Sequence, residues 1–442
     1  MPEAAESSIR FASALSTRRD ASAAADEACD RVRSRAPGVD AFDFGLLCIT
    51  AGHGPQAADI ERAIRERLGV RSMLTVAGSG VLGDGLQVRG APGASLLVGS
   101  LPGVDVHAFR VQDLPRPSAE TDADWSLEHL AAPLGLDRPD ARCTILMTDP
   151  YSVPMTRLLP AIADARPGPG VPIIGGVASA GRGPGQNVLA LNGAVMHAGG
   201  IGVTLSGPIG VDADVSQGCL GFGPTMVVTG CRENVLLELG GRRAFDAVRE
   251  AVVGLSPDQR TRLSSGLFIG RVINEYKDRF GRDDFLIRGV RGFDEDAGAV
   301  LTDDFFRVGQ TIRLHYRDTQ TAREDLGMVL DRQRLRPKPA GVLVIPCQGR
   351  EAGPAGMPGY DASAVANAFA DRRHGADEAK GGMPIEPVSD DVPAIAGFEA
   401  AGEIGPIGDG VHMHTQSAVI ASFRALREAH DDESSEQVST KK

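Results

Sequence analysis

Cys347 is the side chain in this sequence best placed to do chemistry. It follows the apolar segment GVLVIP (341–346) and precedes the glycine-rich stretch QGREAG (348–353). Backbone N–H groups of such a stretch, Gly349 among them, can contact an anion, and the charge of Arg350 would lower the pKa of a nearby thiol. No general base adjoins Cys347 in the sequence, and free cysteine is among the most buried residue types. We therefore favour a pocket-lining or structural cysteine over a nucleophile.

His412 and His414, in the segment HMH, are the candidate partners of that thiol. Strand alternation puts both imidazoles on one face and Met413 on the other. Two imidazoles can bind a metal, but a catalytic site needs a third protein ligand, which the sequence does not identify. Strand-end histidines with hydrogen-bonded rings are the simpler interpretation, so we expect no metal and no cofactor. A dyad of Cys347 with His412 or His414 stays open as the catalytic alternative.

Glu403 is the third candidate, in the stretch AAGEIGPIG (400–408) between Gly402 and Gly405. Apolar neighbours predict that this element is buried, and a buried carboxyl needs a polar partner. A ligand amine, a neighbouring arginine or backbone N–H groups would each serve. Capping of the glycine turn is an equally good structural interpretation.

The elements that must position these residues recur along the chain. An apolar strand, a polar or glycine-rich loop, a helix, a second strand, a glycine cluster and a further strand appear three times, over 44–103, 143–207 and 341–423. In this alignment Cys347 takes the place of His53 and Pro150, and we expect the three strand-end loops to meet at one edge. A degenerate fourth copy is expected over 260–318, after a helix over 233–252.

The repeats predict an α+β fold of two related domains, built of repeated β-α-β-β units with mixed sheets layered by helices. We expect a flexible leader over 1–10, an N-terminal domain over 11–215 and a C-terminal domain over 216–427. The polar segments 374–391 and 428–442 read as a flexible insertion and a disordered tail. The motif GSGVLG (78–83) has the spacing of a dinucleotide fingerprint, but the glycine-rich and proline-containing sequence after it cannot begin a helix, so we expect a turn between strands.

Composition excludes several classes of function. The 442 residues are 42% hydrophobic and 24% charged, as in a packed globular chain. A formal net charge of −12, without a basic patch, argues against nucleic acid or a membrane surface as partner. The six cysteines are scattered with no C-x-x-C pair, and no signal sequence or segment of about 20 apolar residues is present. We expect a cytoplasmic protein with reduced thiols.

Several segments together resemble the FIST proteins over about residues 10–425. They are FASALSTRRDASAA (11–24), LNGAVMHAGGIGVTLSG (191–207), VSQGC (215–219), RVGQTIRLHYRDTQTAREDL (307–326), PCQGRE (346–351) and GFEAAGEIGPIG (397–408). The resemblance implies an N-terminal and a C-terminal FIST domain that form a sensory module for small ligands, with amino acids as the proposed candidates. It also implies a signalling output, which here would be a separate partner protein. The chain departs from the family in DGVHMHTQSAVIASF (409–423), where His414 is the best match, and at the 374–391 insertion.

The expected function is therefore a cytoplasmic small-molecule sensor, with a cysteine-dependent enzyme as the alternative. The predicted ligand-binding residues are Cys347, Gly349, Arg350, Gly402, Glu403, Gly405 and His414. Glu403, Arg350 and the glycine backbone would complement the ammonium and carboxylate groups of an amino acid. A pocket at Cys347 also predicts that its thiol is labelled faster than Cys48 or Cys143, which we expect inside strands.

Overall fold

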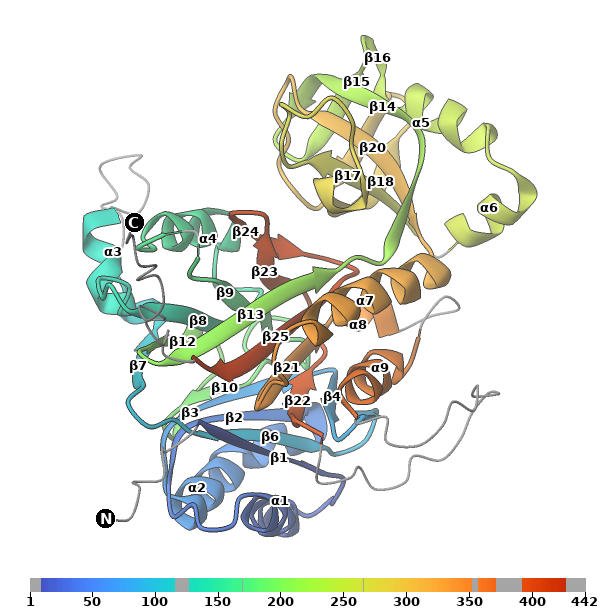
Figure 1. Ribbon diagram of the computed structural model, residues 1–442. Helices are drawn as coiled ribbons and strands as arrows, with labels where there is room; N and C mark the ends of the chain where they lie inside the picture. Colours follow the sequence, from blue (N-terminus) through green and yellow to red (C-terminus); the bar gives the residue numbers. More distant parts are fainter. Residues whose placement is uncertain are drawn as a thin grey trace, which may run out of the picture.

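A computed structural model describes residues 9–115, 127–168, 170–264, 266–351, 357–370 and 392–426 (Figure 1). The predicted insertion and tail lie outside the described residues, as does all of the predicted leader except residues 9 and 10. The described part is an α+β fold of mixed and antiparallel sheets covered by helices, which confirms the predicted class.

Most of the described chain folds as three copies of one unit. Each copy contributes an N-terminal strand, a parallel βαβ crossover, a short hairpin and a last strand. The first copy contains β1 (Arg10–Ser16), α1 (Ala21–Arg35), β2 (Phe42–Thr50), α2 (Ala57–Leu68), β3 (Val70–Gly78), β4 (Gly80–Gly83), β5 (Leu86–Arg89) and β6 (Ala94–Ser100). The second contains β7 (Asp105–Arg110), α3 (Leu127–Leu134), β8 (Ala141–Thr148), α4 (Met155–Asp164), β9 (Ile173–Val177), β10 (Leu189–Leu191), β11 (Ala194–Met196) and β12 (Gly200–Ser206). The third contains β13 (Ile209–Ser216), α7 (Thr319–Arg334), β21 (Gly341–Pro346), α8 (Gln348–Glu351), α9 (Tyr360–Phe369), β22 (Ala394–Phe398), β23 (Glu403–Ile407), β24 (Gly410–His414) and β25 (Ala418–Ala425).

The copies exchange their hairpins in a cycle. Within the described residues the three sheets run β1-β6-β2-β3-β10-β11, β7-β12-β8-β9-β23-β24 and β13-β25-β21-β22-β4-β5. The first four strands of each sheet come from one copy, and the last two are the hairpin of another. The hairpin β23–β24, which carries Glu403 and both histidines, is therefore bonded to the sheet of the second copy. No copy completes its sheet alone, so the three fold as one body.

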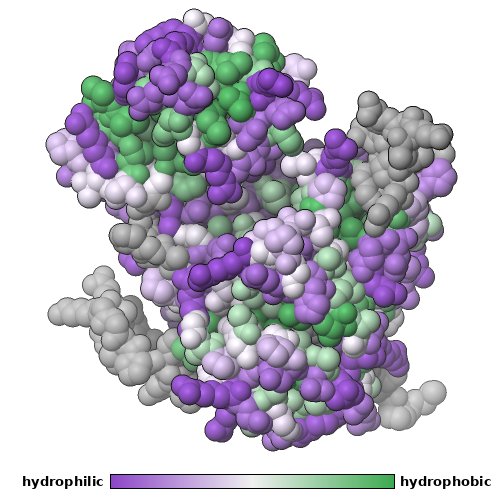
Figure 2. Space-filling view, turned by 180° about the vertical axis from the view of Figure 1, so that it is seen from behind, coloured by the Kyte–Doolittle hydropathy of each residue, from purple (hydrophilic) through white to green (hydrophobic). Residues whose placement is uncertain are grey.

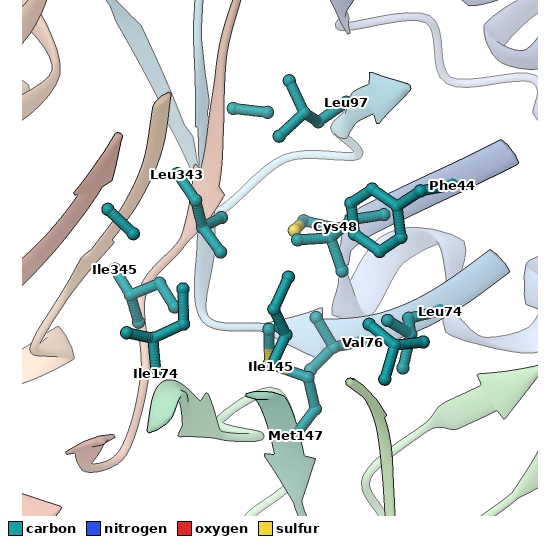
Figure 3. Packing of buried hydrophobic residues seen from close by; sticks show 14 of the residues in the cluster. Phe44, Cys48, Leu74, Val76, Leu97, Ile145, Met147, Ile174, Leu343 and Ile345 are labelled. Atoms are coloured by element: carbon teal, nitrogen blue, oxygen red, sulfur yellow. The ribbon is translucent and has the colours of Figure 1, made fainter. Parts of the chain in front are cut away.

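The three sheets face one another across a shared core. Alternate residues of each central strand point inward, where they form one apolar cluster (Figure 3). The inward set includes Phe44 and Cys48 of β2, Ile145 and Met147 of β8, and Leu343 and Ile345 of β21. The outward residues of the same strands pack under the helix pairs α1/α2, α3/α4 and α7/α9. Because both faces are buried, these strands are continuous apolar runs rather than alternating ones.

A separate barrel is inserted between β13 and α7 (Figure 1). It contains β14 (Cys219–Arg232), β15 (Val235–Leu239), β16 (Arg242–Arg243), α5 (Ala244–Val253), α6 (Pro257–Leu263), β17 (Leu267–Val272), β18 (Phe285–Asp294), β19 (Ala299–Thr302) and β20 (Thr311–Arg317). The strands follow the order β14-β20-β17-β18-β19-β15-β16, and an additional pairing of β14 with β15 closes the barrel. The three-sheet part is called the body below. The predicted boundary between residues 215 and 216 falls at the end of β13, just before the chain enters the barrel.

Two expectations for this region are wrong. The segment expected as a helix over 233–252 begins with the hairpin β15–β16, and α5 starts only at Ala244. Gly240 and Gly241, both at positive φ, form the hairpin turn, a conformation that a helix excludes. The expected fourth copy is also absent from the described residues, because β17, β18 and β20 pair antiparallel with no helical crossover.

The motif GSGVLG lies in strand and turn, as predicted. Residues 80–83 form β4, which pairs antiparallel with β5. Asp84 and Gly85, with φ values of 53° and 74°, make the tight turn between them. The glycines thus serve a β-hairpin, with no helix N-terminus at this position.

Candidate functional site

Cys347 lies at the carboxyl end of β21, beside the parallel strand β22. Its backbone N–H donates to the carbonyl of Ser417 at 2.8 Å. The same bond recurs in the other copies, from Thr50 to Gly93 at 3.0 Å and from Asp149 to Gly199 at 2.9 Å. Thr50 and Asp149 are therefore the structural equivalents of Cys347.

This register corrects the alignment with His53 and Pro150. His53 lies three residues beyond Thr50 in a short 3-10 helix (Ala51–Gln56), where its ring Nε2 hydrogen-bonds the carbonyl of Arg18 at 3.0 Å. Pro150 is exposed one residue after Asp149. The sequence alignment slipped because the three loops differ in length and shape.

The loops after β3, β9 and β22 meet and bond in a ring. Ser179 N–H donates to the carbonyl of Ala77 at 3.2 Å, and Ala401 N–H donates to that of Val177 at 2.9 Å. Ser79 completes the ring, since its hydroxyl donates to Glu399 at 2.8 Å and its N–H to Ser179 at 2.8 Å. The loops after β3, β9 and β22 therefore form a junction tied by hydrogen bonds, and they are a different set from the expected loops of His53, Pro150 and Cys347.

Glu399, which our sequence reasoning missed, anchors this junction. Its side chain is fully buried and forms an ion pair with Arg89 at 2.8 Å, in addition to the bond from Ser79. Burial raises the pKa of this carboxyl, while Ser79 and Arg89 favour its charged form. The available signal was an acid directly after the apolar strand 394–398.

The thiol of Cys347 has a carboxyl for its neighbour. Cys347 is 3% exposed, and its pKa is raised first by burial and then by the nearby Glu403. The backbone N–H groups of Gln416 and Gly349 hydrogen-bond the sulfur and act in the opposite direction. The charge of Arg350, which the sequence suggested would lower this pKa, is directed elsewhere. At neutral pH the thiol stays protonated.

Glu403 is fully buried at the start of β23. Its Oε2 accepts hydrogen bonds from the hydroxyl of Ser417 at 2.7 Å and from the Ser417 N–H at 3.3 Å. Burial nevertheless raises the pKa of the carboxyl to about 8. The Cys347 thiol lies beside it and favours the charged form, and within the described residues Oε1 has no hydrogen-bond partner. Thiol and carboxyl therefore share a buried, weakly satisfied polar site.

Gln416 is the second residue that the sequence analysis missed. It has a φ of 61°, a left-handed conformation uncommon for a residue other than glycine. Its amide packs against Gly349 so closely that a Cβ there would lie 2.4 Å from Gln416 Nε2. Gln416 Oε1 is buried without a hydrogen-bond partner among the described residues. A side chain at position 349 would therefore displace the Gln416 amide, while the backbone N–H at 349 would remain.

Arg350 ties the loop after β21 to three other elements. It is 1% exposed, and its Nε and Nη2 bind the two carboxylate oxygens of Asp361 on α9 at 2.8 and 3.2 Å. Its remaining described bonds go to Gln217, Ser216 and Ala322. A buried arginine engaged in this way fixes the position of the loop.

Both histidines lie on β24, on one face, with ring centroids 6.2 Å apart. His414 is buried, its Nε2 bonds the carbonyl of Gly405 at 3.1 Å, and burial lowers its pKa to about 3. Burial and the charges of Arg288 and Arg271 lower the pKa of His412 to about 4. In the described contacts neither ring bonds the Cys347 thiol, and no cluster of three potential metal ligands occurs there.

The two glycines beside Glu403 have structural contacts. A Cβ at Gly405 would lie 2.7 Å from the side chain of Val215, so this strand can approach β13 only with glycine. The carbonyl of Gly402 accepts the N–H of Val177 at 2.9 Å, which joins β23 to the second copy. Both positions hold the hairpin in place.

An open cleft of about 560 Å³ lies between the barrel and the body, next to this buried site. α4 and β24 form the body wall, and β17, β18 and residues 303–310 form the barrel wall. Ala401 and Thr415 line the cleft at the ends of the two loops that flank Glu403 and Ser417. Figure 2 shows the barrel as a lobe set apart from the body by a recess.

Comparison with known proteins identifies the chain. Residues 43–242 match the FIST N domain and residues 244–406 match the FIST C domain. The chain belongs to the FIST family. An uncharacterized protein of Mycobacterium bovis is 31% identical over 420 residues, which are 94% of this chain and 99% of that protein. An uncharacterized protein of Mycobacterium tuberculosis is 30% identical over 418 residues, 94% of this chain and 100% of its own length.

FIST domains are associated with sensory signal transduction. The boundary between the two matches falls inside the barrel, at β16 just before α5, so each domain match includes part of the body and part of the barrel. None of the described helices is long and apolar enough to cross a bilayer.

The burial of Cys347 reverses our expectation for thiol labelling. Cys48, Cys143 and Cys347 are all buried with raised thiol pKa values, whereas Cys231 is half-buried on the barrel. We expect a small alkylating agent to label Cys231 first and the other three at similar slow rates, because only an accessible thiolate reacts. Mass spectrometry of the native protein after timed labelling measures this order. Labelling of Cys347 before Cys231 would show an open, activated thiol instead.

Proposed function

We propose that this FIST protein is a cytoplasmic small-molecule sensor whose ligand binds in the cleft between the barrel and the body. The observation that carries the proposal is that one cavity is lined by residues of both lobes. Its volume of about 560 Å³ suits a small metabolite, since ligand sites typically measure about 300–1,000 Å³. Amino acids and their derivatives remain the first candidates, because the barrel wall offers arginines for a carboxylate and Asp303 for an ammonium group.

Ligand binding at this place would act on the relative position of the lobes. Two chain connections, which meet where Asp318 N–H donates to the carbonyl of Gly218 at 3.2 Å, join the barrel to the body. Near the cleft, Arg288 donates to the carbonyl of Met413 and Thr415 to that of Ile287, each at 3.0 Å. A ligand that contacts both walls stabilises the arrangement of barrel and body in which both walls are within its reach. A separate output protein would then read the altered surface.

In this proposal the wall of the cleft is supported from within the body by the predicted residues Cys347, Gly349, Gly402, Glu403, Gly405 and His414. Apart from Gly349, which is half-buried, they are buried behind the loops that end at Ala401 and Thr415. The alternative function, a cysteine-dependent enzyme, requires an activated thiol beside an imidazole, and the contacts of Cys347 favour neither.

Filling the cleft tests the proposal. Thr156 is exposed on the first turn of α4 and lines the cavity, so Thr156→Trp adds bulk there without entering the core. Thr261→Trp, on the exposed surface of α6, is the matched control. A thermal-shift screen of amino acids and small metabolites should find stabilising ligands for the unmodified protein and for Thr261→Trp, but not for Thr156→Trp. Equal stabilisation of both variants would place the ligand elsewhere.

A further inference from the structure

The barrel wall of the cleft is rich in positive charge. Among the described residues, the arginines and acids that line it are Arg271, Arg288, Arg291, Arg307, Asp303 and Asp304. The arginines outnumber the carboxylates on this wall, although the whole chain carries a formal net charge of −12. A cavity of opposite sign to the whole molecule concentrates ligands of the molecule's own sign.

The two carboxylates do not neutralise the four guanidinium groups. Asp304 is shared between Arg288, at 2.5 Å, and Arg271, at 3.5 Å. Arg291 reaches Asp303 only at 3.7 Å and is otherwise exposed. The guanidinium of Arg307 makes no ion pair or hydrogen bond within the described part of the chain. Arg291 and Arg307 therefore retain donors for a ligand.

The neighbouring histidine responds to the same positive potential. His412 lines the cleft on the opposite wall, and after burial the causes that lower its pKa are the charges of Arg288 and Arg271. The first turn of α4 also lines the cleft. Its Met155 and Arg157 N–H groups already donate to the carbonyls of Val153 and Pro154, so its contribution to this field is that of the helix dipole.

Beside His412, Thr156 and Thr415, the body wall also carries apolar side chains. Met155 and Leu159 of α4 and Val411 of β24 face the cleft, and Phe305, on the barrel wall, is 53% exposed. Such a surface gains from contact with the hydrocarbon part of a ligand.

We infer that the cleft takes a small anionic amphiphile, in which a carboxylate or phosphate group binds Arg291 and Arg307 and an apolar group packs against α4 and Phe305. This inference rests on the proposed function and narrows its ligand class. A free zwitterionic amino acid fits less well than a derivative whose amine is masked, because the wall offers more cationic than anionic groups.

Calorimetric titration of the full chain tests the inference with matched six-carbon probes. Hexyl phosphate and hexanoate are the anions, hexanol and hexylammonium are the controls, and inorganic phosphate lacks the apolar part. We expect an anionic probe to bind at least about ten times more tightly than hexanol, as charged hydrogen bonds permit. The stronger of the two anions identifies the head group as phosphate or carboxylate.

Two pairs of arginine variants complete the test. The double variant Arg291→Gln/Arg307→Gln should weaken binding of the anion by about tenfold or more. The double variant Arg232→Gln/Arg279→Gln removes two exposed barrel arginines outside the cleft, and should bind within about twofold of the unmodified protein because solvent screens distant charges.

The outcomes separate this inference from the proposed function. Equal binding of hexanol and the anions, or equal weakening in both double variants, would overturn the anionic assignment. Binding of inorganic phosphate as tight as that of hexyl phosphate would overturn the apolar part. If amino acids bind, Thr156→Trp prevents it and no anionic probe binds, the proposed function stands and this inference fails. If neither set of ligands binds, both fail.

Discussion

Asp361→Ala is expected to lower the free energy of unfolding by about 3–5 kcal/mol, because it leaves the guanidinium of Arg350 buried without its carboxylate. The side chains of this pair are 2% and 0% exposed, and the Nε–Oδ2 distance is 2.8 Å. Water cannot replace the lost partner at such a site. Urea denaturation at constant pH measures the change.

Two further variants make the test specific. Asp59→Ala breaks an exposed pair with Arg62, whose side chains are 65% and 63% exposed, and should cost less than about 1 kcal/mol. Arg350→Met combined with Asp361→Leu should recover part of the loss, since apolar pairs often replace buried ion pairs with little cost. Recovery stays partial because Arg350 also bonds Ser216, Gln217 and Ala322. A loss in Asp361→Ala no larger than that in Asp59→Ala would contradict the structural role of the pair.

The recurrence of strands was predictable because burial on both faces produces continuous apolar runs in the sequence. Runs such as GVLVIP (341–346) are apolar at every position, since odd residues face the common core and even residues face the helices. The exchange of hairpins was not predictable, because the sequence of β23 pairs equally well with any strand of similar length. Which sheet receives it depends on contacts such as that of Gly402 with Val177, 225 positions apart in the sequence.

Part of the candidate site was predicted from residue type alone. Cys347, Gly349 and Glu403 were chosen from the sequence by residue type, and the structure brings them together. The ion pair of Arg350 with Asp361 was not predicted, because Asp361 lies in a helix with no sequence feature that marks an ion pair. Gln416 gave no signal, since a left-handed glutamine is imposed by its surroundings rather than by its own preference.

The cleft could not be predicted at all. It exists because the barrel, which departs from the repeated pattern, is inserted between β13 and α7 and comes to lie against β24. Its arginines are spread over residues 271–307 and look like ordinary surface charges in the sequence. Only the closed barrel places Arg271, Arg288 and Arg307 on one wall.

Glu403→Gln is expected to remove a large part of the pH dependence of stability between about pH 4.5 and pH 8. The ordinary pKa of 4.5 applies to the unfolded chain, and burial raises the folded value to about 8. Below pH 4.5 both states hold the proton, so the contribution of Glu403 to stability is fully present. As the pH rises, the unfolded chain releases the proton and the folded protein keeps it. Wild type therefore loses up to about 1.4 kcal/mol per pH unit, until the folded carboxyl also ionises near pH 8.

Glutamine resembles the protonated acid in shape but does not titrate, so the variant should lack this loss. Urea denaturation at several pH values from 4.5 to 9, for both proteins, gives the difference in their free energies of unfolding. That difference should shift steadily in favour of the variant up to pH 8 and then level off. Glu238→Gln, at an exposed glutamate of the barrel, serves as the control and should leave the profile unchanged. Parallel profiles for wild type and Glu403→Gln would mean that Glu403 is already ionised in the folded protein at acidic pH. The buried thiol and carboxyl would then be an ion site, with a negative charge held beside Cys347 directly behind the cleft.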